Sequence, residues 1–417
     1  MKKLIALFLI AAASAVGQSS EPSLSPAERS VAEARKLIEK KPSQYAGYNQ
    51  LAVALSRRAR ETSDVNFYAQ AEDALKKSLE LAPQNFEAEK IRIWLLLGRH
   101  EFAAAREAAT ALNKRVPDDV LVYGFLTDAN AELGNYKAAE NAAQWMLNLR
   151  PGNLPALTRA AYLRELFGDA DGAYELMYMA LQATPPTERE DVAWVLTQMA
   201  HLRLIAGKTQ DAETLLNQAV GKFPGYHYAL ANLAKVRISQ KRYDEAVSLL
   251  EQRYKAAAHA ENLYDLAEAL ELAGRTAEAQ RAFAEFETKS LAESVRADNS
   301  NRELIFYYAD HAHQPVKALD VARREYARRH DVYTLDAYAW ALHVNGDDSE
   351  ARRQIETALG VGIRDAKIFR HAGEVALKLG DKAAAERYLN ESASLNAPGS
   401  EQARTLLAAL SHGSAKQ

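Results

Sequence analysis

The 417-residue sequence contains no cysteine. This absence excludes disulfides, thiolate metal ligands and cysteine nucleophiles, so packing alone must stabilise the fold. Proline and glycine are also scarce, at 12 and 19 residues, while 48% of the residues are hydrophobic. Such a composition is typical of a helix-rich globular chain and differs from that of a disordered one.

The sequence also lacks an excess of charge of one sign. Its formal net charge is −3, so the overall balance favours neither a nucleic acid nor an anionic membrane surface as partner. The basic residues do not form the aromatic-interleaved stripe that is typical of nucleic-acid binding. We therefore expect no nucleic-acid partner.

Long apolar runs are missing except near the start. Residues 1–3 are Met-Lys-Lys, residues 4–13 are apolar, and small residues follow that offer cleavage after Ala15 or Gly17. This pattern predicts a secretory signal peptide over 1–17 and a flexible linker over 18–30. Ten apolar residues are few for a membrane span, and the alternative is an uncleaved anchor. No cysteine follows the run, so it is not a lipoprotein signal. We expect an exported chain, periplasmic or extracellular in a bacterium, that does not span the membrane once cleaved.

Ten alanines recur at a nearly constant spacing. The successive intervals are 34, 34, 34, 39, 34, 33, 39, 33 and 34 residues, so two of them carry a five-residue insertion. A fixed period of this length indicates a repeat architecture whose units stack on one another. We expect the small alanine side chain where two antiparallel helices approach most closely. The ladder consists of Ala71, Ala105, Ala139, Ala173, Ala212, Ala246, Ala279, Ala318, Ala351 and Ala385.

Glycine and proline recur at fixed distances from these alanines. A glycine five residues before the alanine allows a left-handed backbone at the end of a first helix. A proline twelve residues after the alanine ends the second helix. The glycines are Gly134, Gly168, Gly207, Gly274, Gly346 and Gly380, and the prolines are Pro83, Pro117, Pro151, Pro185 and Pro224.

This pattern resembles the tetratricopeptide repeat (TPR) family from about residue 44 to 398. Close matches are Leu133-Gly134-Asn135-Tyr136-Lys137-Ala138-Ala139-Glu140 with Arg150-Pro151-Gly152-Asn153, and Leu379-Gly380-Asp381 with Ala384-Ala385-Glu386. Stretches such as Tyr307-Tyr308-Ala309-Asp310-His311 are similar to exported bacterial TPR proteins of unassigned function.

The resemblance implies an all-α fold, a right-handed α-solenoid of about ten helix-turn-helix hairpins over residues 31–398. A capping helix over 399–411, with Ser400 as its N-cap, is predicted to cover the last open face. A disordered tail would follow over 412–417.

Three stretches depart from the period. Residues 57–65 are expected to lengthen the turn within the first unit, and residues 185–191 to widen one junction. Residues 287–301 are polar, and Pro315 is expected to open the next second helix. We expect the solenoid to bend at these places.

In the resembled family the first helix of each hairpin lines a concave groove, which implies the groove residues of this chain. They are Trp94, Arg159, Tyr162, Trp194, His201, Tyr228, Asn232, Lys235, Tyr264, Asp265, Glu268, Glu303, Tyr307, Asp310, Asp336, Trp340, Arg370 and His371.

Two groups in this set carry a binding hypothesis. The acids from Asp265 to Asp310, with Tyr264 and Tyr307 between them, form a wall suited to an extended partner with basic and apolar side chains. The alternative is an ordinary solvated face. Arg159, Trp194, Asn232 and Lys235 are suited to a carboxylate or a sugar hydroxyl, and the alternative is ordinary surface and packing. The family's carboxylate clamp for chain termini is absent from the first two units.

Enzyme and metal signatures are missing. The sequence contains neither a nucleophile elbow, nor a phosphate-binding loop, nor a dinucleotide fingerprint. His311 and His313 are two residues apart and point in different directions on a helix, so we expect no metal site there. We expect no cofactor and no catalysis. The sequence predicts an envelope scaffold for a protein or extended peptide, or alternatively an accessory protein for envelope polysaccharide assembly or export that binds glycan or its machinery.

Overall fold

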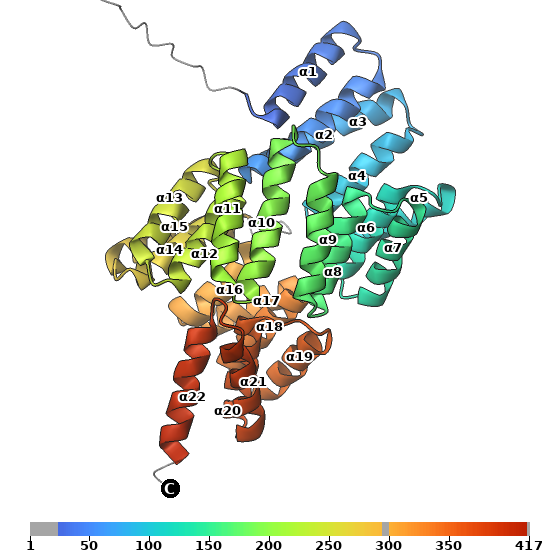
Figure 1. Cartoon of the computed structure of the whole chain (residues 1–417). Helices are drawn as coiled ribbons and strands as arrows, with labels where there is room; N and C mark the ends of the chain where they lie inside the picture. Colours follow the sequence, from blue (N-terminus) through green and yellow to red (C-terminus); the bar gives the residue numbers. More distant parts are fainter. Residues whose placement is uncertain (1–23, 294–299, 415–417) are drawn as a thin grey trace, which may run out of the picture.

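The computed structural model of the chain describes residues 24–293 and 300–414. All regular structure in these two ranges is helical (Figure 1), which confirms the predicted all-α solenoid. The predicted signal peptide over 1–17 lies outside the described residues. In chain order the helices are α1 (Pro26–Lys40), α2 (Tyr45–Thr62), α3 (Asn66–Leu81), α4 (Phe86–Gly98), α5 (Phe102–Arg115), α6 (Val120–Glu132), α7 (Tyr136–Leu149), α8 (Leu154–Leu166), α9 (Ala170–Ala183), α10 (Arg189–Ile205), α11 (Thr209–Lys222), α12 (His227–Ser239), α13 (Tyr243–Ala256), α14 (Ala260–Leu272), α15 (Thr276–Glu293), α16 (Ser300–Phe306), the π-helical η1 (Tyr307–His311), α17 (Pro315–Tyr326), α18 (Val332–Val344), α19 (Asp348–Gly360), α20 (Ala366–Lys378), α21 (Lys382–Ser394) and α22 (Ser400–Ser414).

The helices from α2 to α21 pair into ten hairpins, which we call units 1 to 10. Unit 1 is α2 with α3, unit 10 is α20 with α21, and α16 with η1 serves as the first helix of unit 8. Each ladder alanine lies in the second helix of its unit, and all ten are 0% exposed. A side chain larger than alanine would hold the paired helices further apart, so the ladder marks the closest packing of each hairpin.

Both ends of the array differ from the predicted boundaries. Helix α1 begins at Pro26, so residues 26–30 are helical and not a linker. The Ser25 hydroxyl accepts a hydrogen bond from the Glu28 amide at 3.1 Å, and the Glu28 carboxylate accepts one from the Ser25 amide at 2.7 Å. This reciprocal capping box defines the start of α1.

The last helix is longer than predicted. Helix α22 packs on α21 and reaches Ser414, so residues 412–414 are helical and not part of a tail. Ser400 is its first residue, and the Ser400 hydroxyl donates to the Ser392 carbonyl at 2.6 Å instead of capping α22. Among the described residues no helix combines the length and the apolar character that crossing a membrane requires.

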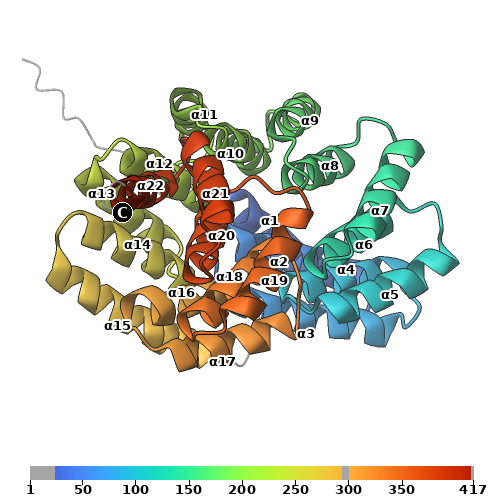
Figure 2. The same cartoon turned by 90° about the horizontal axis from the view of Figure 1, so that it is seen from below.

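The solenoid winds far enough for its end to lie against its earlier units. Seen from below, the helices from α5 to α17 form a ring, and α18, α20 and α21 lie across its centre (Figure 2). The amide of His330, just before α18, donates to the carbonyl of Glu132 at the end of α6 at 2.9 Å. The Val332 amide donates to the Tyr136 hydroxyl at 3.0 Å. The second superhelical turn therefore rests on the first.

Three of the predicted turn glycines form this contact between the superhelical turns. A Cβ atom added to Gly134 would lie 2.8 Å from the His330 carbonyl oxygen. At Gly168 it would lie 2.5 Å from the Gly362 oxygen, and at Gly207 it would lie 2.7 Å from the Leu395 oxygen. Real Cβ atoms do not approach backbone oxygens this closely, so the turns of units 3 to 5 need glycine for packing as well as for their positive φ.

A candidate binding cavity on the concave face

The first predicted irregularity is a longer helix, not a longer turn. Helix α2 has 18 residues, whereas the first helices of units 2, 3 and 4 have 13 each. Helix α10 has 17 residues, because the insertion at 185–191 supplies an extra first turn. These two extensions meet: the Arg60 guanidinium pairs with Glu190, and its Nη2 lies 2.9 Å from Asp191 Oδ1. We call this contact between units 1 and 5 the clasp.

The clasp is extended by two residues at the start of unit 6. The Tyr226 hydroxyl donates to Glu190 Oε1 at 3.0 Å, and His227 Nε2–H donates to the Arg60 carbonyl at 3.0 Å. Burial lowers the pKa of His227 to about 4, so this imidazole is neutral at physiological pH. Burial raises the pKa of Glu190, and the charge of Arg60 opposes that rise. The clasp is thus a largely buried polar contact.

A cavity of about 390 Å³ lies beside the clasp. Its wall combines α2, α6, α8 and α10, which belong to units 1, 3, 4 and 5. Three of the predicted groove residues, Arg159, Tyr162 and Trp194, line it together. The full lining is Arg60, Asp128, Leu154, Pro155, Thr158, Arg159, Tyr162, Asp191, Trp194 and Val195.

The charges in the cavity wall are already paired. Arg159 Nε lies 2.8 Å from Asp128 Oδ1, and Arg159 Nη2 lies 2.5 Å from Asp128 Oδ2. The same guanidinium donates to the carbonyls of Gly124 and Pro155, both at 3.1 Å. A ligand carboxylate would have to compete with Asp128 for Arg159, which weighs against the carboxylate alternative for this group of residues.

Several polar groups at the cavity keep hydrogen-bonding capacity. Within the described part of the chain, the Tyr162 hydroxyl and Trp194 Nε1 have no recorded hydrogen bond, and Arg60 Nε is buried without a partner. Burial, followed by the charge of Glu132, raises the pKa of Tyr162 well above its ordinary value, so its hydroxyl stays protonated. The Tyr162 hydroxyl and the Trp194 indole N–H are therefore donors that a polar ligand of the cavity could use.

The other predicted residues of the early and middle units lie outside this lining. Trp94 is half-buried against the core of α4 to α6. His201 Nε2 lies 2.9 Å from Glu165, and the Asn232 side chain donates to the Tyr228 carbonyl at 3.0 Å. Lys235 is exposed, and Tyr228 is half-buried.

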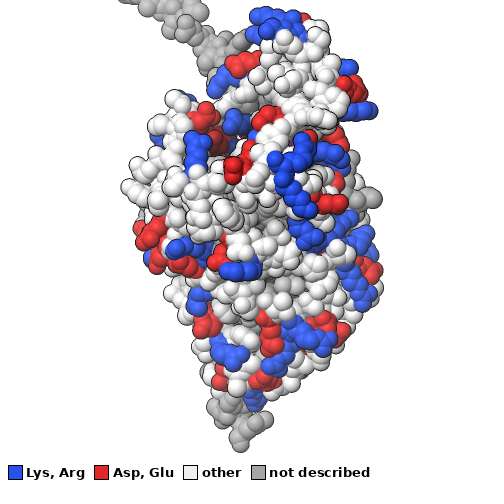
Figure 3. Space-filling view, turned by 90° about the vertical axis from the view of Figure 1, so that its right-hand side faces the viewer, with Lys and Arg blue, Asp and Glu red and all other residues white. Residues whose placement is uncertain are grey.

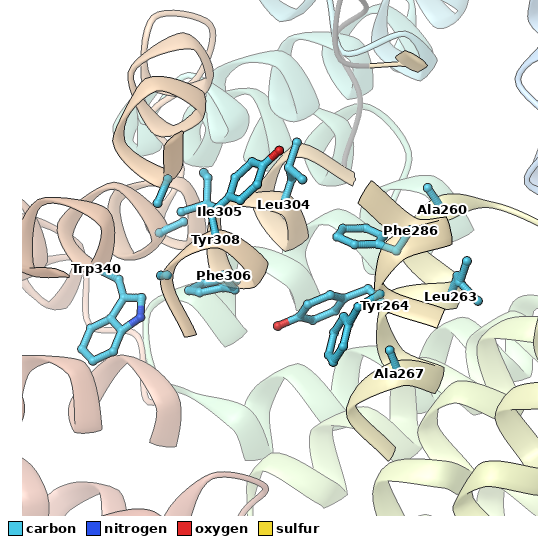
Figure 4. Close-up of a cluster of buried hydrophobic side chains, with 14 of the residues drawn as sticks. Ala260, Leu263, Tyr264, Ala267, Phe286, Leu304, Ile305, Phe306, Tyr308 and Trp340 are labelled. Carbon is cyan, nitrogen blue, oxygen red and sulfur yellow. The ribbon is translucent and has the colours of Figure 1, made fainter. Parts of the chain in front are cut away.

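Four predicted groove residues of the later units are buried. Tyr264, Asp336, Trp340 and His371 have exposed fractions between 0% and 6%, so they do not lie on an open wall. Figure 4 shows Tyr264 and Trp340 within a cluster that also contains Phe286 and Phe306. The indole of Trp340 donates to Asp310 at 2.7 Å and stacks on His371 with 4.1 Å between ring centroids. These four predicted groove residues are therefore part of the packing within and between units and do not line an open groove.

The remaining acids and bases of this set are engaged within the chain. Asp265 pairs with Arg253, and Arg370 pairs with Glu374. Glu268 accepts from the Tyr264 hydroxyl at 2.9 Å, and the Tyr307 hydroxyl lies 3.4 Å from Glu287. Burial and then the charge of Glu261 raise the pKa of Glu303 to about 8. Asp265, Glu268 and Asp310 of the predicted acidic wall therefore make contacts within the chain, and Glu268 remains 43% exposed.

Clusters of metal-ligating side chains and patches of surface charge are the remaining features that could mark a second binding site. Within the described ranges no group of three or more His, Asp or Glu side chains is placed to hold a metal ion. On the face drawn in Figure 3, side chains of both signs are interspersed over the surface.

Comparisons with known proteins agree with the fold. Residues 203–258 match the family model described as tetratricopeptide repeat. A structure of the human IFIT1 dimer with m7Gppp-AAAA is 14% identical, covers 88% of this chain and 85% of that chain, and has a TM-score of 0.51. Yeast Tom70 is also 14% identical, with 92% of each chain covered and a TM-score of 0.41. At 14% identity the likeness to the IFIT1 structure concerns the fold alone.

A search of curated proteins found no match to this sequence. The type IV pilus biogenesis factor PilW is 13% identical in structure-based comparison, covers 49% of this chain and 93% of that chain, and has a TM-score of 0.42. The family model matches residues 203–258, and the alanine ladder and helical hairpins continue the same repeat architecture from α2 to α21.

Proposed function

We propose that this chain is a non-catalytic scaffold of the bacterial envelope that holds a protein or an extended peptide on its concave face. The tetratricopeptide fold is one of interaction scaffolds in general, because stacked units present a long curved surface with exchangeable side chains. The envelope is proposed from the export signal expected over residues 1–17.

One observation carries the concave-face proposal. The predicted groove residues of units 4 to 6 keep solvent access, whereas four of those in units 7 to 10 are buried. The accessible residues are Arg159, Tyr162, Trp194, His201, Tyr228, Asn232 and Lys235. A mixture of aromatic, amide and charged side chains on one concave surface favours specific binding of a partner.

The absence of catalysis is part of the proposal and rests on the carboxylates of the cavity. Asp128 is paired with Arg159, and Asp191 is paired with Arg60. Each carboxylate of the cavity wall is thus engaged by an arginine, which supports a binding role in place of acid–base chemistry.

The test is a cross-linked pull-down of the mature protein from its own envelope. The binding variant combines Tyr228→Ala with Lys235→Glu, since Tyr228 is half-buried and Lys235 is exposed on unit 6. The control is Lys137→Glu, whose side chain is 81% exposed on α7. We expect a partner that the unaltered chain and the control enrich and that the binding variant loses. Equal recovery by all three chains would contradict binding at the concave face.

Export has a separate test. We expect the protein isolated from the periplasm or medium to start after Ala15 or Gly17. A protein in which mass spectrometry finds the intact sequence from Met1 would contradict a cleaved signal.

The cavity favours a second candidate function, an accessory role in envelope polysaccharide assembly or export. Trp194 and Tyr162 place aromatic rings beside paired arginines and carboxylates. This arrangement suits a glycan, and a scaffold that gathers proteins around a glycan would use both kinds of surface.

A further inference from the structure

The cavity is electrostatically balanced. Each arginine in its wall has a carboxylate partner, Arg159 with Asp128 and Arg60 with Asp191 as well as Glu190. A charged ligand would therefore meet a wall whose opposite charges are already compensated, and it would have to break one of these pairs. The balance favours an uncharged ligand.

The same pairs leave room for hydroxyl groups. The Asp128 side chain is 35% exposed and the Asp191 side chain is 26% exposed, so their oxygens can accept further hydrogen bonds. The Arg60 side chain, which lines the cavity, is 35% exposed. A hydroxyl group both donates and accepts, so it can donate to a carboxylate while it accepts from the neighbouring guanidinium. A ligand with several hydroxyls can use several of these places at once.

The remaining wall is aromatic and aliphatic. Trp194 is half-buried, and Tyr162 lies in the first helix of the preceding unit, α8. Leu154, Pro155 and Val195 add aliphatic surface to the lining. Aromatic faces provide rigid contact area at a small entropy cost, and a pyranose ring offers a matching face of C–H groups. The volume of about 390 Å³ lies within the range of ligand cavities, roughly 300–1,000 Å³.

We propose that this cavity binds a neutral saccharide unit, with the sugar ring against Trp194 and its hydroxyls between the arginine–carboxylate pairs. This inference rests on the second candidate function and names its ligand class. An uncharged peptide side chain is the competing occupant, but it carries one hydroxyl at most and could bridge only one carboxylate and its neighbouring guanidinium.

The clasp gives Arg60 a role in this site. Arg60 comes from unit 1, while the other lining residues come from units 3 to 5, so the cavity is complete only when the extension of α2 reaches α10. Arg60 is thus a positioning and binding residue that the repeat pattern alone does not place in the groove.

The experiment measures saccharide binding by the purified mature chain. An array of neutral and uronic-acid-containing oligosaccharides, together with uncharged peptides, is probed first, and isothermal titration then gives the affinity of the best neutral saccharide. Trp194→Ala should weaken that affinity roughly tenfold or more, since an aromatic contact contributes about 1.5 kcal/mol. Asp191→Asn tests the polar wall without removing the aromatic ring, and it should also weaken binding.

The matched control is Trp145→Ala. Trp145 is 52% exposed on α7 and stacks on Tyr123, outside the cavity lining. It should leave saccharide affinity unchanged. Binding of uronic-acid-containing saccharides or peptides in place of neutral saccharides, binding of none of the neutral saccharides, or equal losses in Trp194→Ala and Trp145→Ala would overturn the inference. None of these outcomes affects the pull-down, which tests the protein scaffold independently.

Discussion

The turns of units 3, 4 and 5 and those of units 7, 9 and 10 share a glycine at the same motif position but differ in surroundings. All six glycines have positive φ, between 71° and 89°. A Cβ at Gly134, Gly168 or Gly207 would collide with a backbone oxygen of the second superhelical turn. A Cβ at Gly274, Gly346 or Gly380 would meet nothing within 4 Å. The repeat motif therefore determines the backbone conformation within each hairpin. The superhelical winding determines which hairpins contact the other superhelical turn.

The concave faces differ in the same way. In units 4 to 6 the first helices keep partly exposed side chains, and three of them line the cavity. In units 7 to 10 four of the predicted groove residues, Trp340 and His371 among them, are buried, while others such as Glu268 stay half-exposed. The four buried side chains interrupt the accessible surface in the later units, and the cavity lies in the middle units.

One alanine substitution in each class of turn glycine tests this comparison. Gly380→Ala should cost about 1–2 kcal/mol, the penalty for a left-handed non-glycine residue. Gly168→Ala adds the collision with the Gly362 oxygen at 2.5 Å, which should raise the cost by about 1–3 kcal/mol more. Urea unfolding at equilibrium measures both. Equal losses of unfolding free energy would contradict the stacking of the two superhelical turns at unit 4.

The clasp gives the next largest effect. Breaking a buried pair by removing one partner costs about 3–5 kcal/mol, and we expect Arg60→Met to cost about 2 kcal/mol because the Arg60 side chain is 35% exposed while Glu190 is 9% exposed. The control is Arg99→Met, which removes an ion pair to Glu72 whose side chains are 42% and 60% exposed. It should cost below about 1 kcal/mol. Similar losses in both variants would show that the two extensions do not meet.

The pH dependence of stability sharpens the account of the clasp. The folded pKa of His227, about 4, lies below its ordinary value of 6.5. Between these pH values the unfolded chain binds a proton that the folded chain does not, so stability falls as the pH drops from 6.5 towards 4. At pH 5 the loss from this group should be on the order of 2 kcal/mol. His227→Gln keeps a donor for the Arg60 carbonyl and should remove this part of the pH dependence.

The measurement compares unfolding free energies of the variant and the unaltered chain at pH 7.5 and pH 5. Buried carboxyls such as Glu132, whose pKa is raised to about 7 by burial, titrate with the opposite sign, but they contribute equally to both chains. His201→Gln serves as control, because that side chain is 29% exposed. If His227→Gln lost as much stability between the two pH values as the unaltered chain, the claim that His227 is buried and neutral in the folded chain would be contradicted.

The sequence predicted the elements that repeat. The alanine ladder, the turn glycines and the ten hairpins follow from local rules that act within one unit, and Pro315 opens its helix as expected. Arg159, Tyr162 and Trp194, which are among the predicted groove residues, line one cavity, because neighbouring first helices share one register. The start of α1 was missed although Ser25 and Glu28 have capping-box spacing.

The contacts between superhelical turns could not be predicted. Arg60 meets Glu190 across 130 residues, and that contact depends on the pitch that many small rotations between units add up to. One local feature of the sequence does indicate the longer helix that carries Arg60. Residues 56–61 contain neither glycine nor proline, which favours a continued helix over a turn. The burial of Tyr264 and Trp340 has a shorter range, since Tyr264 packs on Phe283 and Phe286 of its own unit and Trp340 stacks on His371 of the next unit.

Cross-linking across the two superhelical turns tests the central claim most directly. The chain has no native cysteine, so Asp169→Cys with Arg364→Cys introduces a single reactive pair beside the contact of Gly168 with Gly362 and Arg364. Both native side chains are about half exposed, at 50% and 46%. A short bis-maleimide should link the two cysteines within one folded chain, and the link should not form in denaturant. Failure to link them in the folded chain would contradict a superhelix whose second turn rests on its first.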